Sequence, residues 1–156
     1  CTLYTLASAT GGSGVFQQAI TVTGSNKVII NLTASIAHQA NNYVAMGAVF
    51  RGTAVDTAIG SCAKIGVGTN QGSGQNTASF ALTTHQDVQN APPNGALMFE
   101  DTPGAGTYYY KVGIYIENHS SDSSLNFGYL NAAKNDGNQA YKAIVVSSLT
   151  LMEIKV

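Results

Sequence analysis

Few residues in this sequence have the types and spacing that catalysis or metal binding requires. Histidine is the commonest metal ligand and general base, but His38, His85 and His119 lie far apart along the chain. His85 and Asp87 bring two metal-ligand types close together, and we interpret them as part of a surface loop. The segment 135–138, Asn-Asp-Gly-Asn, has oxygen donors but is too short for an EF-hand calcium loop.

The carboxylates and the glycine-rich stretches also miss the patterns of catalytic sites. Glu100 and Asp101 are adjacent, so on a strand they would point to opposite faces and could not act as an acid pair. The glycine-rich stretches lack both the Gly-x-Ser-x-Gly spacing of a hydrolase nucleophile and the third glycine of a phosphate-binding loop. We therefore predict no enzyme activity, no catalytic residue, no bound metal and no cofactor.

The elements that would position any site are predicted to be strands. Charged residues make up 10% of the chain, against about 25% in ordinary soluble domains. A chain of 156 residues has the length of one domain and can bury its own core, so we assign residues 1–156 to a single domain.

The net charge of −1, with no basic cluster, predicts no nucleic-acid partner. The apolar runs are too short for membrane insertion.

Apolar residues recur with the period of two that is typical of β-strands. In segment 27–37, for example, Val28, Ile30 and Leu32 alternate with residues of the opposite face. Turn residues separate such segments, and no segment has the apolar stripe of a helix. About ten short antiparallel strands predict an all-β sandwich of the jelly-roll kind. The expected strands are 2–9, 15–23, 27–37, 43–51, 53–59, 78–84, 96–100, 107–118, 125–130 and 143–156.

The last third of the chain has the strongest pattern. Segment 143–156 is apolar on both faces, which is typical of a central strand or of a strand at a subunit interface. Pro103 and Gly104 predict a tight turn, because proline presets φ and glycine supplies a positive φ at the next position. The residues that we expect in the core or at a trimer interface are Tyr108, Tyr110, Val112, Leu149 and Leu151.

One combination of residues resembles a known family. It consists of Asp101, Pro103, Gly104, Gly106, Tyr108 and Tyr110, followed by a closing Ser-Ser-Leu-Thr-x-x-Glu strand at 147–153. This combination resembles the C-terminal heads, or knobs, of bacteriophage tail fibres, spikes and tail needles. The matching residues lie in the last third, and the first 95 residues agree only in their rhythm of short strands.

The resemblance implies a homotrimer of jelly rolls shaped like tumour-necrosis-factor and C1q domains. It implies assembly in the host cytoplasm and a place in the virion, where the head binds a bacterial surface polysaccharide or outer-membrane protein during host attachment. The closing strand and the strand 107–118 are then expected in the sheet nearest the threefold axis. Because the chain begins at Cys1, we expect an upstream stalk that is missing here. From polarity alone, the receptor-binding residues are predicted to be Gln71, Ser73, Gln75, Asn90, Asn94 and Asn138.

Three alternatives stay open. The domain could be a structural trimerisation or capsid-decorating cap that binds no receptor. It could be a depolymerase or lyase whose active residues lie between subunits, or a secreted C1q-like lectin, since Asn31 and Asn118 begin glycosylation-type triplets. Cys1 and Cys62 are too few for a disulfide framework, and we expect free thiols, with Cys62 buried as a small apolar residue.

Overall fold

The computed structural model describes residues 2–5, 16–37, 44–66, 80–83, 94–116, 129–130 and 147–156. This part of the chain forms ten β-strands and one 3-10 helix, and all its strand pairs are antiparallel. The expected all-β class is therefore confirmed. The elements are β1 (Thr2–Thr5), β2 (Gln17–Val22), β3 (Lys27–Ala37), β4 (Val44–Gly52), η1 (Ile59–Ser61), β5 (Ala63–Ile65), β6 (Phe80–Thr83), β7 (Asn94–Asp101), β8 (Gly106–Ile116), β9 (Tyr129–Leu130) and β10 (Ser148–Ile154).

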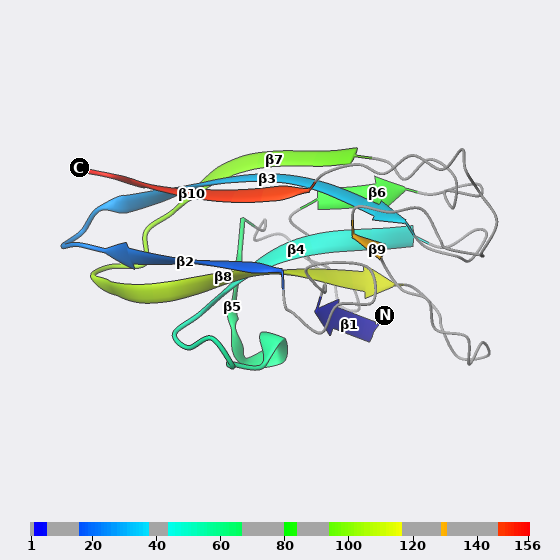
Figure 1. Ribbon diagram of the computed structural model, residues 1–156, viewed down its shortest axis with the longest axis horizontal. Helices are drawn as coiled ribbons and strands as arrows, with labels where there is room; N and C mark the ends of the chain where they lie inside the picture. The colour runs from blue at the N-terminus through cyan, green and yellow to red at the C-terminus, as the bar shows by residue number, and fades with distance from the viewer. Residues whose placement is uncertain are drawn as a thin grey trace, which may run out of the picture.

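These strands form two sheets, which Figure 1 shows as stacked layers. In the larger sheet β8 is central: β4 pairs along one side of it, while β2 and β1 pair with successive parts of the other side. β5 and β6 extend this sheet by pairing with β4. In the smaller sheet β3 lies between β10 and β7, and β9 pairs with the end of β3.

The core lies between the sheets and follows from the alternation in β3. Val28, Ile30 and Leu32 are completely buried, and Tyr110 and Val112 of β8 belong to the same buried cluster. Burial of one such aliphatic side chain contributes about 1.5–3 kcal/mol relative to exposure. The period of two in the sequence thus predicted both the bounds of β3 and the face that it buries.

The outer side of the larger sheet is covered by the segment between β4 and β5. Phe50 of β4 is buried there, with Ile59 and Cys62 packed against it. A strand was expected at 53–59, and this prediction is wrong: Thr57 N–H bonds to Ala54 O, and η1 follows. Most of these residues are exposed and none is large and buried, so no packed face holds the segment extended in a sheet.

Lys111 of β8 is buried beneath this covering segment. Its side chain is only 2% exposed, and its Nζ donates hydrogen bonds to the carbonyl oxygens of Val55 at 3.0 Å and Thr57 at 2.5 Å. The half-buried free thiol of Cys62 lies 3.5 Å from Ala58 O. Lys111 is therefore a link between the sheet and its cover.

The two long strands of the last third lie in different sheets, contrary to the expectation that both line one axis-facing sheet. β8 is central in the larger sheet, whereas β10 pairs only with β3 among the described strands. Leu149 and Leu151 pack against the core, while Met152 and Ile154 are exposed. Only one of the two apolar faces of the closing strand therefore packs on the core, and because the strand pairs on one side only among the described strands, it is not a central strand.

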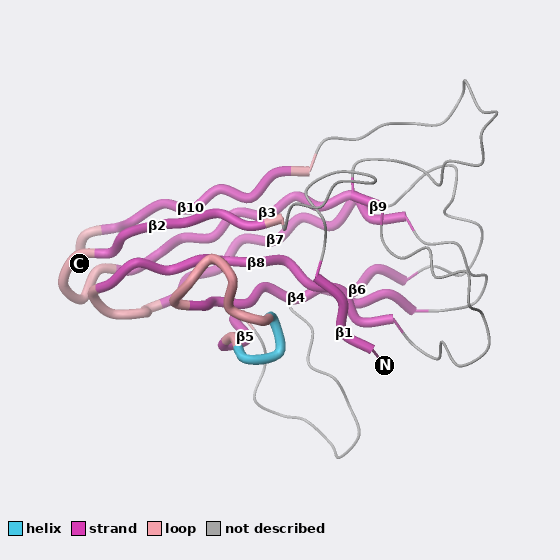
Figure 2. Tube along the Cα trace, turned by 60° about the horizontal axis from the view of Figure 1, so that its bottom comes forward, coloured by secondary structure: helices cyan, strands magenta, loops and turns pink. Residues whose placement is uncertain are grey.

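The free side of β10 lies beside β2 of the other sheet, as Figure 2 also shows. Glu153 joins β10 to the turn between β2 and β3. Its Oε1 accepts hydrogen bonds from Thr23 N at 2.6 Å, Thr23 Oγ1 at 2.8 Å and Asn26 Nδ2 at 2.8 Å. These bonds hold the last strand against the body of the domain.

Candidate functional site

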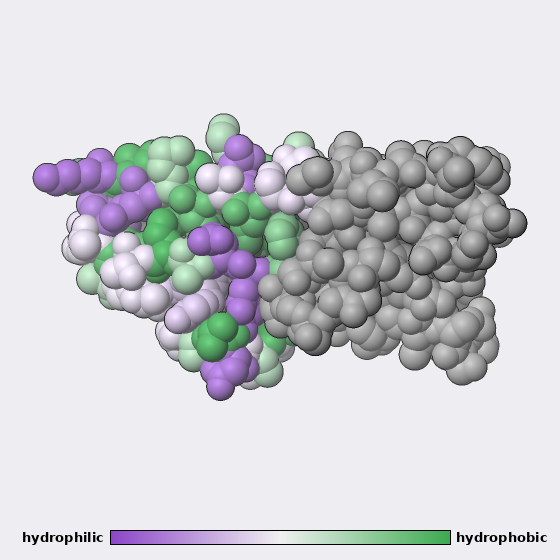
Figure 3. All heavy atoms as spheres, viewed as in Figure 1, coloured by the Kyte–Doolittle hydropathy of each residue, from purple (hydrophilic) through white to green (hydrophobic). Residues whose placement is uncertain are grey.

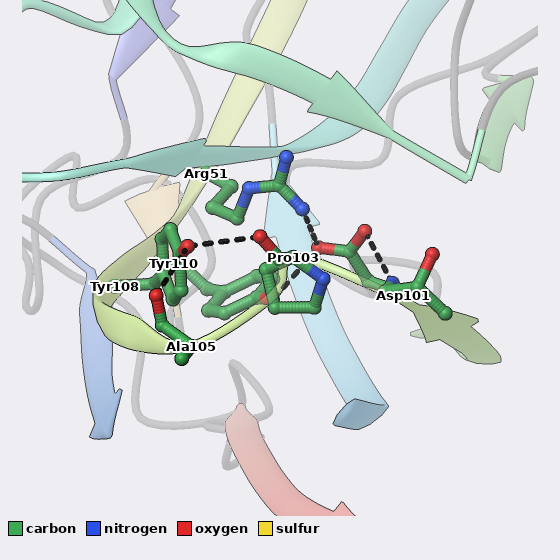
Figure 4. Close-up of polar contacts among 7 residues, drawn as sticks. Arg51, Asp101, Pro103, Ala105, Tyr108 and Tyr110 are labelled. Carbon is green, nitrogen blue, oxygen red and sulfur yellow. Dashed lines mark hydrogen bonds and ion pairs between the residues drawn. The ribbon is translucent and has the colours of Figure 1, made fainter. Parts of the chain in front are cut away.

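Most of the residues that suggested a family resemblance surround one turn, between β7 and β8 (Figure 4). Gly104 has a φ of +82°, the positive value that the predicted turn at Pro103 and Gly104 requires of its glycine. Asp101 ends β7, and its Oδ2 accepts hydrogen bonds from the Tyr110 hydroxyl at 2.7 Å and from Arg51 Nη1 at 2.5 Å. Its Oδ1 accepts the backbone N–H of Thr102 at 2.8 Å. One carboxylate therefore links the turn to β4 and β8.

Tyr108 closes the other side of the turn. Its hydroxyl lies 2.9 Å from Pro103 O, to which it donates a hydrogen bond. The guanidinium of Arg51 lies over the Tyr108 ring, 5.4 Å from its centroid, within the range of a cation–π contact. Arg51 of β4 thus contacts both the carboxylate at the end of β7 and an aromatic ring of β8. Figure 4 draws its bond to the carboxylate.

The electrostatics of this cluster favour a fixed ion pair. Burial alone lowers the pKa of Arg51, but the hydrogen bond and charge of Asp101 outweigh it and raise that pKa above its ordinary value. Burial, reinforced by Asp101, raises the pKa of Tyr110. Near neutral pH the guanidinium therefore stays charged and the phenol stays protonated. The side chains of Arg51 and Asp101 are only 22% and 11% exposed, so the cluster is suited to holding the turn.

Glu100 and Asp101 do point to opposite faces, as expected for adjacent strand residues. While Asp101 turns inward, Glu100 is exposed and accepts a hydrogen bond from Lys27 Nζ at 3.1 Å. This ion pair lies on the outer side of the smaller sheet. We call that surface the three-strand face. It consists of Lys27, Ile29, Asn31 and Thr33 of β3, Ala96, Met98 and Glu100 of β7, and Ser148, Thr150, Met152 and Ile154 of β10.

The three-strand face exposes large apolar side chains. Met98 is 74% exposed, Met152 56% and Ile154 41%. In Figure 3, hydrophobic atoms reach the surface along the edge where Figure 1 draws β7, β3 and β10. The larger sheet differs, because the segment between β4 and β5 covers part of its outer side. Exposed apolar patches mark sites of interaction, so the three-strand face is the candidate functional surface of the described residues.

The residues predicted for the core or a trimer interface lie in the interior of one chain. Tyr110 and Val112 are completely buried, and Tyr108, Leu149 and Leu151 pack against the same cluster while partly buried. Sequence reasoning instead missed Met98, Met152 and Ile154. The signal was present, because these residues are large and apolar at positions that alternate with the core residues of their strands.

Only one predicted receptor-binding residue falls within the described part of the chain. Asn94 begins β7 two residues before the expected start of that strand, and it pairs with Ser35 because β3 is long enough to hold it. The predicted residues that lie outside the described ranges are Gln71, Ser73, Gln75, Asn90 and Asn138.

The candidates for metal chemistry also fall largely outside the described residues. His38, His85, His119 and the segment 135–138 all do so. Within the described ranges, no three histidine, cysteine or acidic side chains gather as metal ligands. The same residues contain no helix of the length and hydropathy that crossing a membrane requires.

Comparison of the chain with protein-family models, curated proteins and solved structures finds no significant match. Its function must therefore be argued from its own residues and geometry.

Proposed function

We propose that this chain is the head of a trimeric phage tail fibre, spike or tail needle, a jelly-roll domain that binds a bacterial cell-surface receptor during host attachment. The observation that carries the assembly part of the proposal is the three-strand face, with Met98 74% and Met152 56% exposed; the receptor-binding part rests on the resemblance. A single copy leaves this apolar surface in water, whereas an assembled head would bury it.

Two further observations support the proposal. Asp101, Pro103, Tyr108 and Tyr110, which carry the resemblance, are hydrogen-bonded around one turn, so the shared pattern has a structural cause. The antiparallel sandwich is a rigid frame of the kind that presents binding loops at its ends. Several heads on one particle would then convert modest individual affinity into avidity.

The test is binding of the fluorescently labelled chain to intact bacterial cells of several species. We expect saturable binding to a host, abolished either by enzymatic removal of surface polysaccharide or by protease treatment of the cells. Alanine replacement of Gln71, Ser73 and Gln75 should weaken this binding while leaving the solution mass unchanged. Replacement of the exposed Val55, which lies on the covering segment, is the control that should leave binding intact.

The alternative is a structural cap that assembles and binds no receptor. The three-strand face favours this function equally, because an apolar face serves assembly with or without a receptor. An assembled chain that shows no saturable binding to any cell in the panel would contradict receptor binding and support the cap.

A further inference from the structure

The three-strand face has a direction along its strands. The register places Lys27 beside Ile154, and Met152, Ile29 and Glu100 in the next row, so both charges lie at one end. The following row joins Thr150, Asn31 and Met98, and the last joins Ser148, Thr33 and Ala96. The face therefore changes from a charged end, whose two rows also hold Ile154, Met152 and Ile29, to an uncharged end.

This gradient matters for how two such faces could meet. If two copies lie with their strands in the same direction, charged rows adjoin charged rows, and Lys27 of one copy can approach Glu100 of the next. If the strands run in opposite directions, the charged end lies against Ser148 and Ala96, and both charges lose water without a new partner. Desolvation of charges without such compensation is costly, so the parallel arrangement is favoured.

A second copy fits this face better than a partner of another kind. The face carries one positive and one negative side chain, which neutralise each other at 3.1 Å, so it offers no field to attract a charged partner. Rotation about an axis along the strands brings each row next to its equivalent in another copy, so the rows that hold Met152 and Met98 each meet their own equivalents. Cyclic symmetry supplies this match automatically.

We infer that copies of this chain associate through the three-strand face, side by side and with their strands in the same direction. The inference rests on the proposed trimeric head and deepens it by naming the contact surface and its polarity. Parallel association points the same end of every copy the same way. Each assembly then presents one set of equivalent loops at one end, as simultaneous attachment to a cell surface requires.

The first test is the solution mass of variants, measured by light scattering on a gel-filtration peak. Met152→Glu should reduce the mass from a multiple of 16.1 kDa to that of one chain, because it replaces an exposed apolar side chain of the face with a second carboxylate in the row of Glu100. Val55→Glu is the matched control, since Val55 is similarly exposed, at 54%, but lies outside the face. Circular dichroism verifies that both variants fold.

The second test concerns direction and mixes two single variants. Lys27→Glu gives the face two negative charges, and Glu100→Lys gives it two positive charges, so each variant alone should associate at least tenfold more weakly than the unaltered chain. Parallel association predicts that an equimolar mixture forms mixed assemblies more readily than either variant alone. Mixing that produces no such gain overturns the parallel arrangement.

The outcomes separate this inference from the proposed function. A Met152→Glu chain that keeps the assembled mass overturns the inference alone. An unaltered chain that stays a single copy overturns both the inference and the trimeric head, while cell binding independently decides receptor recognition. An unaltered assembly that Met152→Glu disperses, but that binds no cell, supports the inference and contradicts receptor binding.

Discussion

At the residue scale, two adjacent carboxylates show how strand geometry separates structural roles. Asp101 turns inward and accepts three hydrogen bonds that hold the β7–β8 turn. Glu100 turns outward and pairs with Lys27 on the three-strand face. The alternation of strand residues predicted that they would diverge. It could not predict their partners, because Arg51 and Lys27 come from other strands that only the tertiary fold brings near.

Asp101→Asn is expected to lower the free energy of unfolding by about 2 kcal/mol, because it removes the charge that pairs with Arg51 in a largely buried position. Urea unfolding at neutral pH measures the change. Glu100→Gln is the matched control, and it should cost less than about 1 kcal/mol because exposed ion pairs contribute little. Equal losses for the two variants would contradict the assigned roles.

The hydrogen bonds that Glu153 accepts predict that the stability of the chain depends on pH. The backbone N–H of Thr23, the amide of Asn26 and the hydroxyl of Thr23 lower the pKa of Glu153 below its usual 4.5. A lowered carboxylate pKa contributes stability that is fully present above the usual value and is lost as pH falls through the folded-state value. The difference in unfolding free energy between the unaltered chain and Glu153→Gln should therefore shrink on acidification. A difference that stays constant down to pH of about 2 would exclude this role.

At the element scale, the long strands were predictable and the covering segment was not. β3 has the bounds that its alternation predicted, because one face is packed against a core and the other is not. Segment 53–62 has no such pattern. The segment is held by hydrogen bonds from Lys111 and by packing over Phe50. Nothing in the sequence distinguishes Lys111 from the other polar residues. Such long-range contacts leave no local signal in the sequence.

The close fit of the covering segment can be tested at Gly52. A Cβ added there would lie 2.9 Å from Cys62 Sγ and 3.2 Å from Thr57 Cβ, so Gly52→Ala must displace the segment. We expect a loss of about 1–3 kcal/mol and faster hydrogen exchange at the Ser61 and Cys62 amides. Gly60→Ala is the control, because a Cβ at Gly60 meets no atom within 4 Å. If both variants exchange like the unaltered chain, the segment is not tightly packed.

At the scale of the whole molecule, the proposed assembly depends on the apolar residues that the core does not use. The sequence predicted the all-β class, and it predicted that Tyr110 and Val112 belong to the core or an interface. It did not predict that β8 and β10 lie in different sheets, because strand order depends on contacts between distant segments. Only the register of β10, β3 and β7 reveals that Met98, Met152 and Ile154 share one exposed face.

The most direct test of the proposed head is the solution mass of the unaltered chain at micromolar concentration, measured by light scattering on a gel-filtration peak. The proposal predicts three times 16.1 kDa, with the three-strand faces buried between copies. A mass of 16.1 kDa that persists as concentration rises would contradict it, because Met98 and Met152 would then remain exposed without serving assembly.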